Sequence, residues 1–246
     1  MASRLAVVTG GGRGIGRAVA AALSAAGQRV VVMGRNEASL REAVASGDAA
    51  GHRGVDVTDG EAFRRALAEV GAVEILVNNA GAAHSEPFVK TGDAEFRAIM
   101  AVNFDSVVTA TRAVLPGMIA RRYGRVISIA SVAGVRGFAY ASAYAAAKHA
   151  VVGLTKSIAL EVAKRGVTVN AVCPGYVDTD IMKENVERLV SLTGRTAEEA
   201  MAFFVNSNPQ KRLLRPEEVA HAVVWLASDG SSAINGQAIV LSGGEG

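Results

Sequence analysis

The sequence predicts one α/β domain in which a parallel sheet of about seven strands carries helices on both faces. Short apolar runs alternate with longer amphipathic or Ala-rich stretches, the pattern of repeated strand–helix–strand units. Half of the 246 residues are hydrophobic, 27 are Gly and only 5% are aromatic, which suits parallel strands packed closely under helices. No linker or low-complexity tract divides residues 1–246, so we expect a single doubly wound domain.

The first half of the chain contains four predicted strands. The run Arg4–Thr9 reads RLAVVT and predicts a buried strand, and Gly27 is well placed to end the helix that follows. Further strands are expected at Arg29–Met33, His52–Val55 and Glu74–Val77, and helices at Gly14–Ala26, Glu37–Ser46 and Gly60–Val70.

The second half begins with a helical stretch, Asp93–Arg121, which we expect to be continuous only after Asn103. Residues 174–212 have a less regular pattern, and we expect a mobile lid over the substrate at 180–212. Pro216 suits the first turn of the last helix. Strands are expected at Arg125–Ile129, Val167–Val172 and Gln237–Leu241, and helices at Ser142–Arg165 and Pro216–Ala227.

Charge and cysteine usage narrow the function classes. The 26 basic and 23 acidic residues are dispersed along the chain, so no nucleic-acid partner is expected. The single cysteine, Cys173, excludes an internal disulfide framework, and no Cys/His cluster has the spacing of a metal site; we expect Cys173 to be a small buried apolar residue. No apolar run of about 18 residues predicts a membrane span. The chain becomes strand-like by Arg4, so we expect no signal peptide and a cytoplasmic location.

A glycine-rich turn, TGGGRGIG at Thr9–Gly16, follows the first strand directly. A strand, a glycine turn, a helix and a second strand about 20 residues on form the context of a Rossmann-type dinucleotide site. Glycine lets the backbone approach a pyrophosphate, which the N-terminus of the helix then holds. A tight strand-to-helix turn without a ligand is the alternative.

The end of the second predicted strand indicates which dinucleotide binds. Sites specific for NAD place an Asp or Glu there for the ribose 2′-hydroxyl, whereas this chain has Gly34, Arg35 and Asn36. Arg35 and Arg13 offer guanidinium groups to a 2′-phosphate, so NADP(H) is the expected cofactor, with NAD(H) as the alternative if Arg35 is only a solvated turn residue. Asp56, followed by Val57, is placed to bond the adenine amino group.

Tyr144 and Lys148 lie four residues apart in a helix-forming stretch, so they project from one face. A phenol is a weak acid–base group at neutral pH, and a neighbouring ammonium favours the phenolate. Alone, such a pair carries little information, because many surface helices have one.

Further motifs accompany this pair, and together they resemble the short-chain dehydrogenase/reductase family over essentially the whole chain. The motifs are TGGGRGIG, NNAG at Asn78–Gly81, Asn103, SVAG from Ser131, YAAAK at Tyr144–Lys148 and PGYVDT at Pro174–Thr179. Six motifs in order are far more specific than any one of them. Ala130 stands where many relatives have a serine, but the catalytic position Ser131 is kept.

The resemblance implies a catalytic role for Tyr144, Lys148, Ser131 and Asn103. Tyr144 would protonate the carbonyl oxygen, Lys148 would bind the nicotinamide ribose and lower the pKa of Tyr144, and Ser131 would orient the substrate oxygen. Asn103 would hold a water that links Lys148 to solvent. The implied cofactor contacts are Gly10, Gly12, Arg13, Gly14, Ile15, Gly16, Arg35, Asp56, Val57, Asn79, Ala80, Gly81, Tyr144, Lys148, Pro174, Gly175, Val177 and Thr179.

The substrate is less clearly indicated. The motif set is similar to that of 3-oxoacyl-carrier-protein reductases and polyketide ketoreductases, which implies reduction of a 3-oxoacyl thioester or a related ketone. Arg122 and Arg165 match the arginines that guide an acyl carrier protein, with Arg121 and Arg125 adding charge; ordinary solvated arginines are the alternative. Phe138 and Tyr140 lie in the loop that faces substrate, beside Ser131 and Tyr144, whereas His149 points elsewhere.

The lid segment contains apolar residues that can form a wall for an acyl chain or be buried within a helix pair or a subunit contact. They are Met182, Leu189, Leu192, Met201, Phe203 and Phe204. An NAD-dependent secondary alcohol or 3-hydroxyacyl-CoA dehydrogenase and a non-catalytic NADP-binding protein remain alternative functions. The resemblance also implies a homotetramer that packs its long helices, near 103–121 and 142–165, across subunits.

Overall fold

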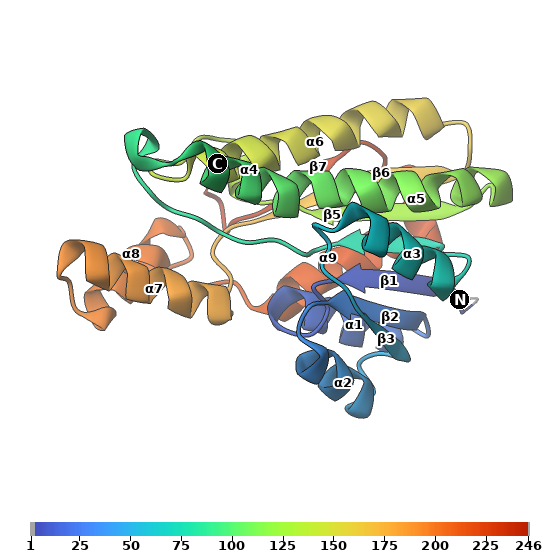
Figure 1. Ribbon diagram of the computed structural model, residues 1–246, viewed down its shortest axis with the longest axis horizontal. Helices are drawn as coiled ribbons and strands as arrows, with labels where there is room; N and C mark the ends of the chain where they lie inside the picture. The colour runs from blue at the N-terminus through green and yellow to red at the C-terminus, as the bar shows by residue number, and fades with distance from the viewer. Residues whose placement is uncertain (1–2, 246) are drawn as a thin grey trace.

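Seven short strands pair as one parallel sheet in the computed structural model, which describes residues 3–245 (Figure 1). The strand order is β3-β2-β1-β4-β5-β6-β7, so the winding reverses between β1 and β4. Ligands of such sheets bind beyond the carboxyl ends of the strands at that reversal. The strands are β1 (Leu5–Thr9), β2 (Arg29–Gly34), β3 (Gly51–Gly54), β4 (Ile75–Asn78), β5 (Gly124–Ile129), β6 (Val167–Pro174) and β7 (Ala238–Leu241).

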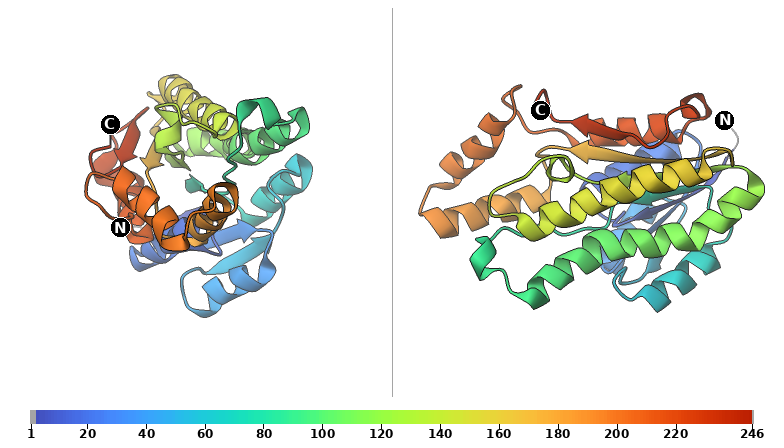
Figure 2. Two further views of the ribbon diagram at one scale, coloured as in Figure 1. Left: turned by 90° about the vertical axis from the view of Figure 1, so that its left-hand side faces the viewer. Right: turned by 90° about the horizontal axis from the view of Figure 1, so that it is seen from above.

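Helices cover both faces of the sheet, and each face has its own hydrophobic core (Figures 1 and 2). Val19, Leu40 and Val223 pack one face, and Phe63 and Met118 pack the other. Because both faces are covered, every residue of β1, β4, β5 and β6 is buried. The first face carries α1 (Gly14–Ala25), α2 (Glu37–Ala45) and α9 (Pro216–Ala227); the second carries α3 (Gly60–Val70), α5 (Ser106–Arg121) and α6 (Ser142–Val162).

The predicted doubly wound α/β fold is confirmed, and the predicted boundaries of most elements lie within three residues of the observed ones. The stretch that begins at Asp93 departs from the prediction because it continues through Asn103. Helix α4 (Asp93–Met100) passes into a π-helical turn, η2 (Ala101–Asp105), and then into α5. Such a turn widens the helix locally and often occurs at functional sites.

The predicted lid region contains a helix pair, α7 (Asp180–Thr193) and α8 (Ala197–Ser207). The two helices project beyond the carboxyl ends of the strands (Figures 1 and 2). Met182 and Phe204 are buried between them, and Leu189 and Met201 pack against this small core, whereas Leu192 and Phe203 are exposed. Most of these apolar side chains therefore serve the helix pair itself, and of the six predicted ones Leu192 and Phe203 keep large exposed surfaces.

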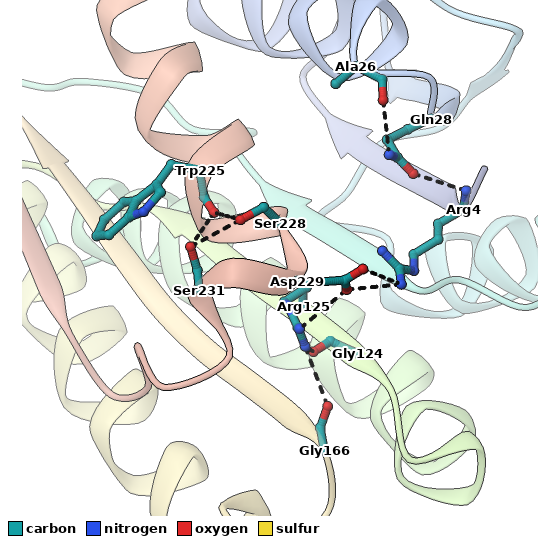
Figure 3. A network of polar contacts seen from close by, with 10 residues as sticks. All are labelled: Arg4, Ala26, Gln28, Gly124, Arg125, Gly166, Trp225, Ser228, Asp229 and Ser231. Atoms are coloured by element: carbon teal, nitrogen blue, oxygen red, sulfur yellow. Dashed lines mark hydrogen bonds and ion pairs between the residues drawn. The ribbon is translucent and has the colours of Figure 1, made fainter. Parts of the chain in front are cut away.

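A polar network fastens the opposite end of the sheet (Figure 3). Arg4 forms an ion pair with Asp229 at 2.9 Å, and the Arg125 guanidinium donates to the Gly124 oxygen at 2.9 Å. The Arg125 side chain is only 4% exposed. The prediction that Arg125 adds surface charge for a partner is therefore wrong: this guanidinium is enclosed at the base of β5.

The continuous helical stretch Asp93–Arg121 is long and apolar enough to cross a membrane by length and composition, with a mean hydropathy of 1.3 in its most apolar window. The stretch holds no uninterrupted apolar run of about 18 residues, as the sequence indicated, because Asp105 and Arg112 lie within its apolar centre. Part of this window is buried in the protein, and α5 packs against the sheet through Ala110, Val114 and Met118. One helix that passes this test is weak evidence for a membrane span.

Candidate active site

The turn after β1 brings the backbone against the start of α1 and leaves no room for a side chain at several of its glycines. Gly10 has a φ of +64°, and a Cβ on Gly16 would lie 2.2 Å from the Gly10 oxygen. A Cβ on Gly12 would lie 2.4 Å from the Ser39 hydroxyl. Helix α1 has neither a side-chain cap nor an acidic residue in its first turn, so its first N–H groups can bind an anion. This cradle fits the pyrophosphate of a dinucleotide.

Residues that follow β4 hold the glycine turn in place. Asn79 donates from its side chain to the oxygens of Thr9 and Gly10, at 2.9 and 3.2 Å. The backbone N–H groups of Asn79 and Ala80 donate to the Thr9 hydroxyl at 2.9 and 3.0 Å. These bonds join the two strands on either side of the winding reversal and fix the position of the cradle.

The surface beyond β2 and β3 carries the groups predicted for the adenosine end. Arg35 is 78% exposed in its side chain, and its guanidinium lies 3.9 Å from the Asp56 carboxylate. Hydrogen bonds from the Thr58 backbone and hydroxyl, at 2.9 and 2.7 Å, lower the pKa of Asp56. Arg13, also exposed, lies 3.6 Å from Glu184 of α7. Both arginines are thus accessible to an added phosphate.

Three of the predicted cofactor contacts turn their side chains into the protein. Ile15 packs against one core, Val57 is buried in the other, and Val177 is 7% exposed. Any contact of Val57 or Val177 with a cofactor must therefore come from the backbone.

Tyr144, Ser131 and Lys148 come together where β5 ends beside the first turns of α6. Ser131 hydrogen-bonds to the Tyr144 hydroxyl, and the Lys148 ammonium lies 5.5 Å from the centre of the Tyr144 ring. Burial raises the pKa of Tyr144, and the Ser131 hydrogen bond partly offsets that rise. The direction is opposite to the lowering expected from a nearby ammonium, because the loss of hydration outweighs the favourable contacts in this arrangement.

Lys148 is a buried amine, with 4% of its surface exposed. Its Nζ donates to the Ile129 oxygen at 2.9 Å. Burial lowers the pKa of Lys148 from 10.5 to about 8, since the charged form loses its hydration. The amine can therefore exchange a proton near neutral pH.

Asn103 faces the same place from the π-helical turn. Its amide Nδ2 donates to the oxygens of Ala82 and Ile99, at 2.9 and 3.0 Å, and its buried Oδ1 has no partner. A Cβ on Gly81 would lie 2.7 Å from that Oδ1 and 3.6 Å from Lys148 Nζ. The buried acceptor and the amine thus flank the same glycine, an arrangement that suits a bridging water.

The Pro174–Thr179 turn lies at the end of β6 beside the glycine cradle. Gly175 donates from its N–H to the Leu241 oxygen at 2.8 Å. The Thr179 methyl would lie 3.3 Å from a Cβ on Gly14, and Thr179 immediately precedes α7. The start of the lid helix therefore meets the proposed pyrophosphate site.

The loop between Ser131 and Tyr144 carries the two predicted substrate contacts. Phe138 is partly buried, and Tyr140 is 65% exposed with a φ of +64°. The Tyr140 oxygen accepts from the Glu86 N–H at 2.6 Å, which ties this loop to the one after β4. His84 in that second loop lies 2.8 Å from the Glu95 carboxylate, a contact that the sequence interpretation did not consider.

His149 and Cys173 lie near the catalytic residues but do not belong to the group formed by Ser131, Tyr144 and Lys148. His149 is exposed, and its Nδ1 lies 2.9 Å from the Ala145 oxygen. Cys173 is fully buried, and its thiol accepts a hydrogen bond from the Ser131 backbone. Cys173 thus lies behind the catalytic serine as a small buried group.

The predicted carrier-protein arginines lie at the other end of the sheet from Tyr144. Arg122 precedes β5 and Arg165 precedes β6, whereas Ser131 follows β5, so roughly 20 Å of strand separates the two ends. The two arginines are exposed neighbours: a Cβ on Gly166 would lie 2.1 Å from the Arg122 oxygen. They cannot flank the active site of their own chain.

The chain resembles known proteins over nearly all of its length. A family model described as short chain dehydrogenase matches residues 4–189. The 3-oxoacyl-[acyl-carrier-protein] reductase FabG of Escherichia coli is 37% identical over 98% of this chain and 96% of its own. D-beta-hydroxybutyrate dehydrogenase of Cupriavidus necator is 36% identical over 98% and 97%. A variant of actinorhodin polyketide ketoreductase, solved with NADPH, superposes with a TM-score of 0.95 at 35% identity, over 99% of this chain and 97% of its own.

Proposed function

The chain belongs to the short-chain dehydrogenase family, and on this premise we propose that it is an NADPH-dependent reductase of 3-oxoacyl thioesters or related ketones. Enzymes of this family interconvert keto and hydroxyl groups. The observation that carries the proposal is the joint placement of Ser131, Tyr144 and Lys148 at the end of β5, on the same edge of the sheet as the glycine cradle.

The reacting groups divide the work between orientation and proton transfer. The Ser131 hydroxyl, which already bonds Tyr144, orients the substrate oxygen between the two hydroxyls. Tyr144 then donates its proton to that oxygen as negative charge develops there. A bound nicotinamide nucleotide supplies the hydride. The raised pKa of Tyr144 keeps the phenol protonated, as reduction requires.

Lys148 and Asn103 return a proton to Tyr144 after Tyr144 has donated its own to the substrate. The pKa of the Lys148 amine, about 8, is close enough to neutral pH for the amine to pass a proton toward Tyr144. The unpartnered Oδ1 of Asn103 beside Gly81 holds the water that connects the amine with solvent. Lys148 would also bind the nicotinamide ribose, and the cradle at Gly10–Gly16 would hold the pyrophosphate.

Arg35 sets the preference for NADPH in this proposal, since β2 ends without an acid. We expect Arg35→Asp to lower kcat/KM with NADPH by about 10–100-fold, the loss that follows from removing one charge-assisted hydrogen-bond partner. The value with NADH should rise, because an aspartate can accept from the ribose 2′-hydroxyl. Arg41→Gln, a change at an exposed arginine of α2 that pairs with Glu37, is the control. Unchanged cofactor ratios in Arg35→Asp would contradict the assignment.

The substrate proposal follows from the names of the relatives. The FabG proteins and actinorhodin ketoreductase are named for reduction of 3-oxoacyl and polyketide groups, and the exposed Leu192 and Phe203 of the helix pair offer apolar surface to an acyl chain. Steady-state assays with acetoacetyl-CoA, an acetoacetyl-carrier thioester, a cyclic ketone and a secondary alcohol, each with both cofactors, test this choice. Highest kcat/KM for a 3-oxoacyl thioester with NADPH is the expected result.

A second candidate is the NAD-dependent oxidation of a secondary alcohol or 3-hydroxyacyl-CoA. The relative named D-beta-hydroxybutyrate dehydrogenase favours it. In the same assays, preferred turnover of an alcohol with NAD would select this function over the reductase.

We also propose a cytoplasmic homotetramer. If α5 and α6 pack antiparallel against a second copy, Arg122 and Arg165 of that copy come toward the active-site end and can guide an acidic carrier protein. Sedimentation at micromolar concentration tests the assembly, and a monomer there would contradict it.

A further inference from the structure

The loop Val135–Ala141, here called the connector, joins the catalytic serine to the catalytic tyrosine. Tyr140 adopts a φ of +64°, a conformation that non-glycine residues adopt only when their surroundings enforce it. One anchor is the bond from the Glu86 N–H to the Tyr140 oxygen, at 2.6 Å. The other end of the connector is held from the C-terminus of the chain.

That second anchor is an ion pair between Arg136 and Glu245, residues 109 positions apart. The Glu245 side chain is only 13% exposed, so its charge is largely shielded from solvent. On the connector, the Arg136 guanidinium also lies over the Phe138 ring, 4.6 Å from its centre. The Glu245 carboxylate is thus linked to Phe138, a predicted substrate contact, through the Arg136 guanidinium.

The C-terminal turn that carries Glu245 is itself built tightly. The Ser242 hydroxyl donates to the backbone oxygen of Glu245 at 2.7 Å. A Cβ on Gly243 would lie 2.2 Å from the Asn208 side chain, just after α8, and a Cβ on Gly175 would lie 3.8 Å from the Glu245 carboxylate. The turn therefore touches the end of the helix pair, the Pro174–Thr179 turn and the connector at once.

A cavity of about 510 Å³ adjoins this turn. Arg136 and Glu245 line it beside Val132 and Val135, and a second ion pair, Arg212 with Glu218, lines it from another side. Neither Arg212 nor Glu218 belongs to the connector, so the second pair provides an internal comparison for the first.

We propose that Glu245 is a positioning residue: it holds Arg136, and through Arg136 the Phe138 ring, as one wall of the substrate site. Glu245 itself touches neither the reacting oxygen nor Tyr144; it acts by fixing the connector. The proposal rests on the reductase function for its kinetic consequences, but the immobility of the connector does not depend on that function.

The first test is Glu245→Gln, which keeps the size of the side chain and removes its charge. We expect KM for the ketone to rise about 10-fold, the scale of one charged hydrogen bond, with the Kd for NADPH unchanged. Amide hydrogen exchange within residues 135–141 should become faster. Glu218→Gln is the matched control: it removes the other ion pair of the cavity and should lower Tm with no effect on this KM.

A double-mutant cycle with Phe138→Leu separates positioning from general stability. If Glu245 acts through Phe138, Glu245→Gln adds little to the KM of the Phe138→Leu protein. Multiplicative effects of the two changes, or an unchanged KM with unchanged exchange in Glu245→Gln, would overturn the proposal. Should the wild-type protein reduce no ketone, the proposed function fails, and the exchange rates alone then decide whether Glu245 fixes the connector.

Discussion

Replacing Tyr144 with Phe is expected to lower kcat by about three orders of magnitude, within the range for loss of a positioned proton donor. The substitution removes one buried hydroxyl and its bond with Ser131, and it leaves the ring in place. The fold and the affinity for NADPH should therefore be retained. Stopped-flow measurement of NADPH oxidation gives kcat, and thermal unfolding with cofactor titration checks the rest.

Tyr123→Phe is the matched control for this change. Tyr123 lies at the other end of the sheet, where the Arg4 guanidinium stands 3.9 Å from the centre of its ring. The same loss of a hydroxyl at that end should leave kcat near the wild-type value. Turnover of the Tyr144→Phe protein within a few-fold of wild type would remove Tyr144 from its role as the proton donor.

Lys148→Met is expected to abolish turnover and yet to stabilise the protein without cofactor at neutral pH. Burial lowers the pKa of Lys148 to about 8 from 10.5, so below pH 8 the folded protein holds a charge that the unfolded chain hydrates better. Removing the amine should raise the free energy of unfolding by up to about 3 kcal/mol there. Loss of the hydrogen bond to the Ile129 oxygen reduces that gain.

The pH dependence identifies the cause of this gain. Between pH 8 and 10.5 the unfolded chain binds more protons at Lys148 than the folded protein does, so wild-type stability rises with pH relative to the variant. The gain of Lys148→Met should therefore shrink across that window and vanish above it. Urea denaturation of both proteins at several pH values measures the difference; a gain that is constant with pH would contradict the burial of a titrating amine.

The fold could be predicted from the sequence because its signals are local and repeated. The all-buried strands alternate with amphipathic helices, and Gly27 and Pro216 stand at helix ends, where their chemistry favours them. The stretch around Asn103 shows the limit of this approach. A π-helical turn adds a residue to one turn and shifts the apolar positions that follow it, so the 3.6-residue pattern is interrupted and did not indicate that the helix continues.

Some parts of the candidate site could be predicted from the sequence and others could not. Short contiguous motifs could be recognised: Thr9–Gly16 predicts the glycine cradle, and Tyr144–Lys148 predicts a pair of side chains on one helix face. The contact of Arg136 with Glu245 joins distant segments and has no signature in the sequence. The enclosure of Arg125 was missed for a similar reason, since a strand end looks the same whether the chain beyond it covers the side chain or not.

The sequence also did not indicate whether the pKa of Tyr144 is raised or lowered in the folded protein. Sequence spacing indicates that an ammonium lies one helical turn away, but it does not indicate how much water the phenol loses. In the folded protein burial is the largest influence on that pKa. The proton is therefore held more tightly than the spacing alone suggested, so the phenol stays protonated at neutral pH but is a weaker acid toward a ketone oxygen.

In the proposed reaction, Tyr144 and Lys148 share one site with the reactive ring of a bound nicotinamide nucleotide. Incubation of the wild-type protein with acetoacetyl-CoA and NADPH deuterated at C4, each face in a separate reaction, tests it by mass spectrometry of the product. We expect one face to deliver a single deuterium to the former carbonyl carbon. A 3-hydroxyacyl product without deuterium at that carbon from either face, or no product at all with any ketone offered, would contradict it.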